Sequence, residues 1–442
     1  MHSTGMQLLL TTTIALILIV AAAQLCGRLA QTLGQPAVVG EMVAGVLLGP
    51  TAFGYLLPDF SARIFSTDVK QILYVMSMVG LSLYMFLVGV EHDGTRLVGK
   101  QRHLPLVLGL FGFALPVAIG MVAAGWLMHG LKPTDVSIEA YVLFIGVGLS
   151  ITAFPMLARV LQDRGMIGTR FGATAIKIAA IDDALAWCAL AVTNAVATHG
   201  TALDALYRTV LPSIALVALA FVVVPVLFRR SIQEAVARGV VDDRLLSSLL
   251  LLVFVASFVS DYVGLYSVFG SFIVGAALPS VPGFAALLQG RMLQVVRCLL
   301  LPIFFAYSGL NANIARALDA STISLFLILL VIAIGAKALP AFAVLRLYRW
   351  PIGEAVAMTG LMNARGLMIL VYVTIGLSIG IIDRTVYSIM VLIAIATTAI
   401  AMPLYRTYFS EAREFEARFD ADGQSGVSGL TIDMAETEDH VS

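Results

Sequence analysis

The sequence predicts an all-α polytopic membrane protein with about 13 transmembrane helices. Of its 442 residues, 60% are hydrophobic and only 12% are charged, whereas soluble domains carry roughly 25% charged residues. Apolar runs of about 20 residues, the length of helix that crosses a bilayer core, recur along most of the chain. The alternating pattern typical of membrane-barrel strands does not occur in the sequence. These observations exclude an ordinary soluble protein.

The predicted spans follow one another with short polar connections. No basic segment precedes the first span and no small-residue cleavage site follows it, so we expect no cleaved signal peptide. The ninth span is short and rich in Gly. We place the spans at residues 6–26, 36–56, 71–91, 104–128, 139–160, 171–196, 209–228, 244–263, 265–281, 290–313, 321–346, 353–379 and 385–408.

The basic residues of the loops predict the orientation of these spans. Placing the C-terminus inside assigns 17 Lys and Arg residues to the cytoplasmic side and six to the outside, and leaves four within spans. We therefore expect a multi-pass protein of the cell (inner) membrane, surrounded by lipid, with its N-terminus outside and its C-terminus in the cytoplasm.

The order of the spans predicts two halves of opposite topology within one transmembrane domain, residues 1–408. If residues 209–228 form a linker helix, repeat 1 covers about residues 6–196 and repeat 2 about residues 244–408. The first helices of the two repeats then cross the membrane in opposite directions. Residues 409–442 are polar and acidic, and we expect a largely disordered cytoplasmic tail that is too short for a nucleotide-binding regulatory domain.

Charge and cysteine content argue against a nucleic-acid partner, a disulfide framework and a metal cluster. Lys plus Arg equals Asp plus Glu, with 27 of each, so the bulk charge suggests no nucleic-acid partner. The three cysteines, Cys26, Cys188 and Cys298, lie in or beside apolar runs and are typical of small buried hydrophobic residues. We expect no cofactor.

Two consecutive aspartates, Asp182 and Asp183, lie about twelve residues into the sixth span, roughly 18 Å along the helix and near the bilayer midplane. A charge at that depth costs several kcal/mol, which makes it a functional candidate. Neighbouring carboxylates in a low dielectric do not both ionise easily, and each can bind a proton or a desolvated cation. The pair therefore predicts a shared proton and monovalent-cation site; the alternative is a pair that only hydrogen-bonds neighbouring helices.

Other charged residues within the spans also need partners. Lys337 lies deep in the eleventh span, so we expect it to pair with one of the two aspartates; the alternative is a side chain that extends to the cytoplasmic surface. Lys177 lies closer to that surface and is expected to reach it. Arg297 is expected to have a structural acid or carbonyl partner. Glu41, in a Gly-rich part of the second span, is either structural or part of the ion path.

Two spans contain matched interruptions. Proline, glycine and polar residues at membrane depth free backbone groups, which are tolerated where they line a cavity. Spans five and twelve occupy equivalent positions in the two halves, and such paired interruptions point to the binding site of a transporter. The alternative for each one is an ordinary kink. The residues expected to line this site are Ser150, Thr152, Pro155, Asn363 and Arg365.

These segments resemble the monovalent cation:proton antiporter family 2, which includes Kef-type and sodium/proton exchangers and plant cation/proton exchangers. The resemblance covers residues 8 to 408. It rests on GQPAVVGEMVAGVLLGPTAFG, MFLVGVEHD, LSITAFPMLARVLQDRG, AAIDDALAWCALA, LPIFFAYSGLNANI and LMNARGLMILV, in this order.

The resemblance implies the sodium/proton antiporter fold, with inverted repeats and crossed discontinuous helices, homodimers, and an elevator-like movement of a core domain. By resemblance, Asp183 matches the ion-binding aspartate and Asp182 matches a partner for Lys337. It also implies exchange of Na⁺ or K⁺ for H⁺ that moves net charge.

Two other functions compete with exchange. A K⁺ efflux pathway resembling a channel could use the same acids without obligatory proton coupling, although the chain has no TVGYG-like filter. An intramembrane aspartyl protease needs two aspartates from different helices, whereas the deep aspartates here are consecutive. We therefore expect a transporter, not an enzyme.

Overall fold

In the computed structural model, residues 2–90, 103–166, 169–199, 211–263, 267–312 and 322–409 are described, together with Tyr207 and Asp319. Within these ranges the chain is helical and contains no strand. The longer elements are α1 (His2–Thr32), α2 (Ala37–Leu48), α5 (Thr67–Val90), α6 (Leu104–Leu127), α7 (Ile138–Ser150), α8 (Phe154–Asp163), α9 (Arg170–His199), α11 (Leu211–Arg238), α12 (Asp243–Val263), α13 (Ser267–Ala276), α14 (Phe284–Val295), α15 (Leu301–Asn311), α17 (Ile323–Leu347), α18 (Ile352–Met362), α19 (Gly366–Ser378) and α20 (Arg384–Tyr408).

Short elements complete the described chain. They are α3 (Phe53–Leu56), α4 (Pro58–Ile64), the 3₁₀ turn η2 (His129–Leu131) and the π-helical turn η4 (Val296–Leu300), which joins α14 to α15.

Within the described residues, each of the 13 predicted spans overlaps one helix or a run of two or three consecutive helices, which confirms the predicted fold class. Ten helical stretches within the described ranges are long and apolar enough to cross a membrane. Two further apolar helices are shorter, Ile138–Ser150 and Ser267–Ala276. The predicted acidic tail, apart from Phe409, lies outside the described residues.

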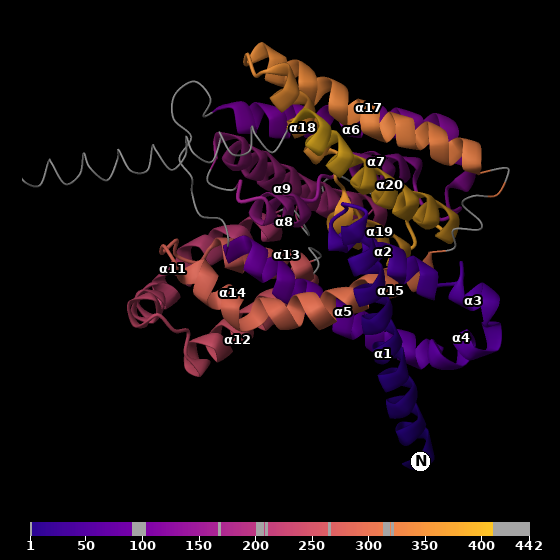
Figure 1. Ribbon diagram of the computed structural model, residues 1–442, viewed down its shortest axis with the longest axis horizontal. Coiled ribbons are helices and arrows are strands. Elements are labelled where there is room, and N and C mark those ends of the chain that lie inside the picture. The colour runs from indigo at the N-terminus through magenta and orange to yellow at the C-terminus, as the bar shows by residue number, and fades with distance from the viewer. Residues whose placement is uncertain are drawn as a thin grey trace, which may run out of the picture.

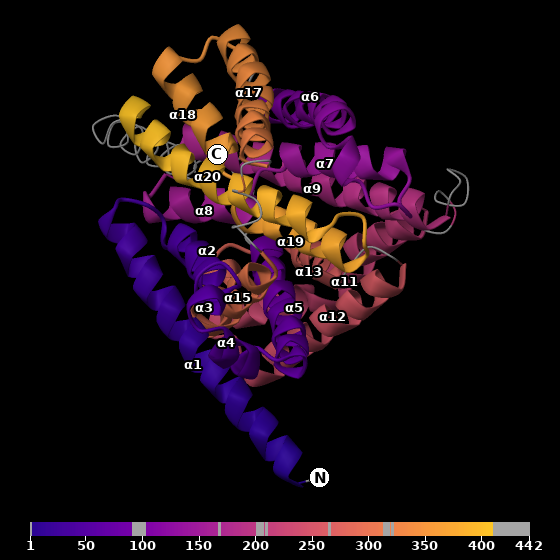
Figure 2. The ribbon, with the colours of Figure 1, turned by 90° about the vertical axis from the view of Figure 1, so that its right-hand side faces the viewer.

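The helices form two blocks, each built from two distant parts of the sequence (Figure 1). We call α6–α9 and α17–α20 the core, in which α6 packs on α7 and α17, and α18 packs on α20. We call α1, α2, α5 and α11–α15 the scaffold, in which α2 packs on α1 and α15, and α13 packs on α5 and α12. The turned view in Figure 2 shows the same division. The predicted repeats, 6–196 and 244–408, thus each contribute helices to both blocks.

Two interrupted helix pairs cross within the core. Residues 151–153 separate α7 from α8, and residues 363–365 separate α18 from α19. The Ala153 N–H donates to the Ala364 carbonyl at 2.9 Å, so each interruption satisfies one backbone group of the other. Gly366, which begins α19, has φ +44°, and a Cβ there would lie 2.9 Å from Met156 Sδ. A glycine is therefore required at this crossing.

The scaffold contains an equally close contact between helices. A Cβ on Gly309 of α15 would collide with the backbone of Gly45 in α2. Small residues let two helix backbones approach in this way, which is how many membrane helices pack. The pair holds α2 against α15 on the side of the scaffold that faces the core.

Candidate functional site

Asp182 and Asp183 lie in the middle of α9 and are almost completely inaccessible to solvent. Asp182 is 0% exposed and Asp183 is 1% exposed. Ionised carboxylates at such positions are costly unless they are paired or bind a cation. The partners of the two side chains therefore determine what the site can do.

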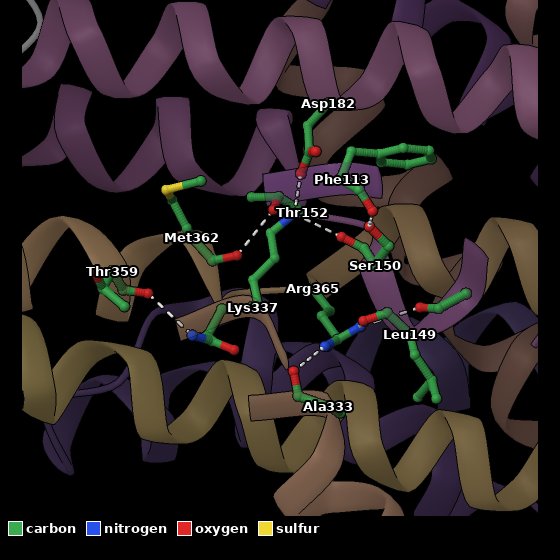
Figure 3. Close-up of polar contacts among 12 residues, drawn as sticks. Phe113, Leu149, Ser150, Thr152, Asp182, Ala333, Lys337, Thr359, Met362 and Arg365 are labelled. Carbon is green, nitrogen blue, oxygen red and sulfur yellow. Dashed lines mark hydrogen bonds and ion pairs between the residues drawn. The ribbon is translucent and has the colours of Figure 1, made fainter. Parts of the chain in front are cut away.

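Asp182 forms an ion pair with Lys337 of α17. The Lys337 Nζ lies 2.5 Å from Asp182 Oδ2, and both side chains are buried. The same ammonium donates to the Ser150 carbonyl at 2.7 Å (Figure 3). The predicted pairing of Lys337 with one of the aspartates is therefore present, and the lysine also joins α9 and α17 to the end of α7.

Asp183 has a different environment. Its carboxylate faces the backbone N–H of Phe154, the first residue of α8. Neither Asp183 oxygen, nor Asp182 Oδ1, meets a hydrogen bond of normal geometry within the described residues. Three buried carboxylate oxygens on adjacent residues are thus available to a proton or a cation, beside the N-terminus of a broken helix.

Arg365 satisfies the backbone end of α7. Its Nη1 donates to the Gly148 carbonyl at 3.1 Å and to the Leu149 carbonyl, and its Nη2 donates to the Ala333 carbonyl at 2.7 Å (Figure 3). Together with Lys337, it supplies donors to the last carbonyls of α7, which otherwise have no helical partner. Arg365 was predicted to line the site. Its guanidinium binds carbonyl groups rather than carboxylates.

The other predicted lining residues hold the crossing together. The Ser150 hydroxyl donates to the Phe113 carbonyl at 2.8 Å, and the Thr152 hydroxyl donates to the Met362 carbonyl at 2.9 Å. Asn363 donates to the Thr359 carbonyl at 3.0 Å, and its buried Oδ1 has no partner in the described chain. Pro155 occupies the first turn of α8, where its missing N–H costs nothing.

Three further charged residues from the sequence analysis lie away from the aspartate pair. Glu41 is on α2 in the scaffold, next to Gly27 of α1. Arg297 is in the π-helical turn η4 of the scaffold. Lys177 lies on α9 and lines a cavity between the core and the scaffold.

That cavity was not foreseen from the sequence. It has a volume of about 650 Å³ and lies between α6 and α9 of the core and α11 and α13 of the scaffold. Ala180, Ala184 and Cys188 line it from α9, whereas Asp182 and Asp183 do not. Ala180, Ala184 and Cys188 recur at helical spacing, but small residues in a membrane helix usually indicate close packing on another helix, so the sequence contains no signal for a cavity.

A comparison with known protein families identifies the family to which this chain belongs. Residues 14–406 match the model of the transmembrane sodium/hydrogen exchanger family. The chain belongs to this family. It is therefore a transporter of the cation/proton exchange type and not an enzyme.

Several relatives support the same assignment for this exchanger. The Na⁺/H⁺ antiporter NhaS4 of Synechocystis sp. is 32% identical over 88% of this chain and 95% of its own length. Cation/H⁺ antiporter 20 of Arabidopsis thaliana is 33% identical over 90% of this chain, and K⁺/H⁺ antiporter 1 of Saccharomyces cerevisiae is 28% identical over 86%. The chain spans about half the length of these plant and yeast relatives, 48% and 44%.

A solved structure confirms the fold of the exchanger. The sodium proton antiporter MjNhaP1 from Methanocaldococcus jannaschii aligns over 93% of this chain and 99% of its own, with a TM-score of 0.61 at 15% identity.

Proposed function

We propose that this exchanger moves Na⁺ or K⁺ in one direction and H⁺ in the other, with Asp182 and Asp183 binding proton and cation in turn. The observation that carries the proposal is the set of three carboxylate oxygens, Asp182 Oδ1 and both oxygens of Asp183, that are buried without normal hydrogen bonds. Leaving an ionised carboxylate in that state costs several kcal/mol. A bound proton or a bound cation removes this cost, and the two compete for the same oxygens.

Lys337 makes the surroundings of Asp182 and Asp183 different. Its ammonium neutralises Asp182 through the contact of 2.5 Å, while Asp183 faces the backbone N–H of Phe154 and forms no ion pair within the described residues. We infer that Asp183 is the first carboxylate to exchange its proton for a cation. A cation that also binds Asp182 competes with the Lys337 ammonium, so its arrival weakens the ion pair. This competition couples cation binding to proton release at two side chains.

The cavity between the blocks supports a route to the pair. It is bordered by the core helices α6 and α9 and by the scaffold helices α11 and α13. Its wall on α9 includes Ala180 and Ala184, the nearest helical neighbours of Asp183 that line it. We propose that ions enter here, and that movement of the core against the scaffold opens the opposite side in alternation. A homodimer formed through the scaffold would hold the scaffold still during that movement.

Purified protein in liposomes with a trapped pH-sensitive dye tests the exchange. Adding NaCl or KCl outside should raise the internal pH without a protonophore, because cation entry drives protons out through the same site. The channel alternative predicts alkalinisation only after a protonophore is added, because cation entry would then be coupled to protons only through the potential.

A pH series in the same assay tests the competition. Lowering the pH should raise the cation concentration needed for half-maximal exchange, by up to about tenfold per pH unit for one shared proton. The maximal rate at saturating cation should change much less. A half-maximal concentration that is independent of pH would contradict a shared site.

We also propose that the exchanger lies in the cell (inner) membrane with its N-terminus outside and its C-terminus in the cytoplasm. The excess of Lys and Arg in the predicted cytoplasmic loops supports this orientation. Fusion of alkaline phosphatase or of a fluorescent protein to the C-terminus distinguishes the two orientations. The phosphatase is active only outside, so the fluorescent fusion should be bright and the phosphatase fusion inactive.

A further inference from the structure

A second cavity, of about 280 Å³, lies between the core and the scaffold where α1, α8 and α20 end. From the scaffold it is lined by the end of α1, including Gln31, and by the turn that leads into α2. From the core it is lined by Arg164, just after α8, and by Arg406 in the last turn of α20. The cavity therefore touches both blocks, and it is separate from the one beside α9.

The lining of this cavity favours an anion. Two arginines line it from the core, and none of the residues that line it is acidic. The Arg406 guanidinium lies against Gly34, where a Cβ would collide with it and where φ is +74°. On the scaffold side α2 begins at Ala37 after the N-cap Pro36, without a side-chain cap. The positive end of that helix adds to the attraction for negative charge.

The chain itself carries a matching anionic segment. Residues 410–442 contain nine Asp and Glu residues against two Arg. Four of these acids fall within Asp433–Asp439, after a stretch rich in Gly and Ser at residues 423–429. Phe409, the last described residue, is only three residues from Arg406. The 24 residues from Phe409 to Asp433 can extend by up to about 80 Å, so chain length does not prevent contact.

We propose that the acidic segment Asp433–Asp439 docks in this cavity, with its carboxylates on Arg406 and at the N-terminus of α2. The Arg406 guanidinium suits a carboxylate because Arg can bind both oxygens of the carboxylate at once. A tethered segment also has an effective concentration in the millimolar range, which favours it over free anions. Because the walls of the cavity come from both the core and the scaffold, a docked segment contacts both blocks. It therefore restrains their relative movement and slows exchange. This last step rests on the proposed function, whereas the docking does not.

Disulfide trapping in the full chain tests the docking. In a background without Cys26, Cys188 and Cys298, Gln31→Cys is combined with Thr437→Cys, which preserves all four acids of the segment. Mild oxidation in nanodiscs of neutral lipid should cross-link this pair. The matched control combines Thr437→Cys with Val240→Cys, at a position that is 52% exposed in the turn between α11 and α12. The control pair should cross-link at least tenfold more slowly.

Charge reversal gives the decisive comparison. Arg406→Glu should reduce the Gln31–Thr437 cross-link at least fivefold, and reversing the charges of the segment should restore it in the same protein. That reversal comprises Asp433→Lys, Glu436→Lys, Glu438→Lys and Asp439→Lys. Restoration also shows that the Arg406→Glu protein is folded. Equal cross-linking to both positions, indifference to Arg406→Glu, or loss of the cross-link when phosphatidylglycerol is added to the nanodiscs would overturn the proposal, the last by assigning the cavity to a lipid headgroup.

Measurements of transport test whether the docked segment slows exchange, separately from whether it docks. Neutralising the four acids of the segment to Asn and Gln should increase the initial rate of exchange severalfold. A retained cross-link with an unchanged rate would overturn the restraint on movement. A retained cross-link in a protein with no exchange at all would instead contradict the proposed function.

Discussion

Asp183 is the residue at which a single substitution tests the proposed chemistry most directly. Asp183→Asn keeps the size of the side chain and removes its ability to release a proton or to neutralise a cation. We expect exchange to fall to the level of empty liposomes while the protein remains folded, because a buried neutral amide costs less than a buried charge. The trapped-dye assay measures the flux, and size-exclusion chromatography checks folding. Cation-driven proton flux that survives in Asp183→Asn would contradict the role of this residue.

The ion pair between Asp182 and Lys337 makes a separate prediction about stability. Lys337→Ala leaves a buried carboxylate without its partner, and breaking a buried pair from one side costs about 3–5 kcal/mol. Lys337→Met combined with Asp182→Asn removes both charges, so most of this loss should be recovered. Thermal unfolding in detergent measures the three proteins side by side. A double variant as unstable as Lys337→Ala would show that the lysine acts mainly through its hydrogen bond to the Ser150 carbonyl.

At the scale of the helices, α2 packs closely on α15 in the scaffold. A Cβ at Gly309 would collide with the backbone of Gly45, which can move only if the two helices separate. Gly309→Ala should therefore destabilise the scaffold by about 1–3 kcal/mol, the usual cost of overpacking. Gly335→Ala in α17 is the control, because a Cβ added there would meet no atom within 4 Å and alanine favours a helix. Equal melting temperatures for the two variants would contradict the tight contact.

The cavity beside α9 predicts that Cys188 can be reached from water. The residue lines the cavity and is exposed. In a protein with Cys26→Ala and Cys298→Ala, a charged methanethiosulfonate reagent should label Cys188 and reduce exchange. Ala184→Phe, which fills the same cavity, should slow both the labelling and the transport several-fold without unfolding the protein. Labelling at the same rate in both proteins would mean that ions reach Asp183 by another route.

How far the sequence predicts each element depends on how local its signal is. The spans follow from runs of apolar residues, and the crossing follows from Pro155 and from the Asn363–Gly366 segment, all visible in one stretch of chain. The contact between Lys337 and Asp182 could be predicted across 155 residues because two buried opposite charges have few other partners. The carbonyl partners of Arg365 could not be predicted from the sequence, because every helix end offers similar hydrogen-bond acceptors.

At the scale of the molecule, the sequence predicts two consecutive repeats but not the blocks they build. The core combines α6–α9 with α17–α20, and the scaffold takes the remaining long helices of each half together with α11. This exchange of helices depends on packing angles between segments far apart in the chain, which periodicity does not encode. Both cavities lie on the boundary that results, so neither could be located before the blocks were known. The boundary is also the surface on which movement must occur if exchange proceeds by alternating access.

The number of charges at the site determines how the whole molecule responds to a membrane potential. If two protons leave Asp183 and the Asp182–Lys337 pair for each monovalent cation bound, one net charge crosses per cycle. A potential of 100 mV then contributes about 2.3 kcal/mol, or about 50-fold in the cation gradient at equilibrium. Liposomes clamped with a K⁺ ionophore should show this dependence for Na⁺ exchange. The Asp182→Asn, Lys337→Met double variant keeps one carboxylate and should exchange one proton per cation without a response to potential. Wild-type exchange that is indifferent to the potential would mean electroneutral transport in spite of the second aspartate.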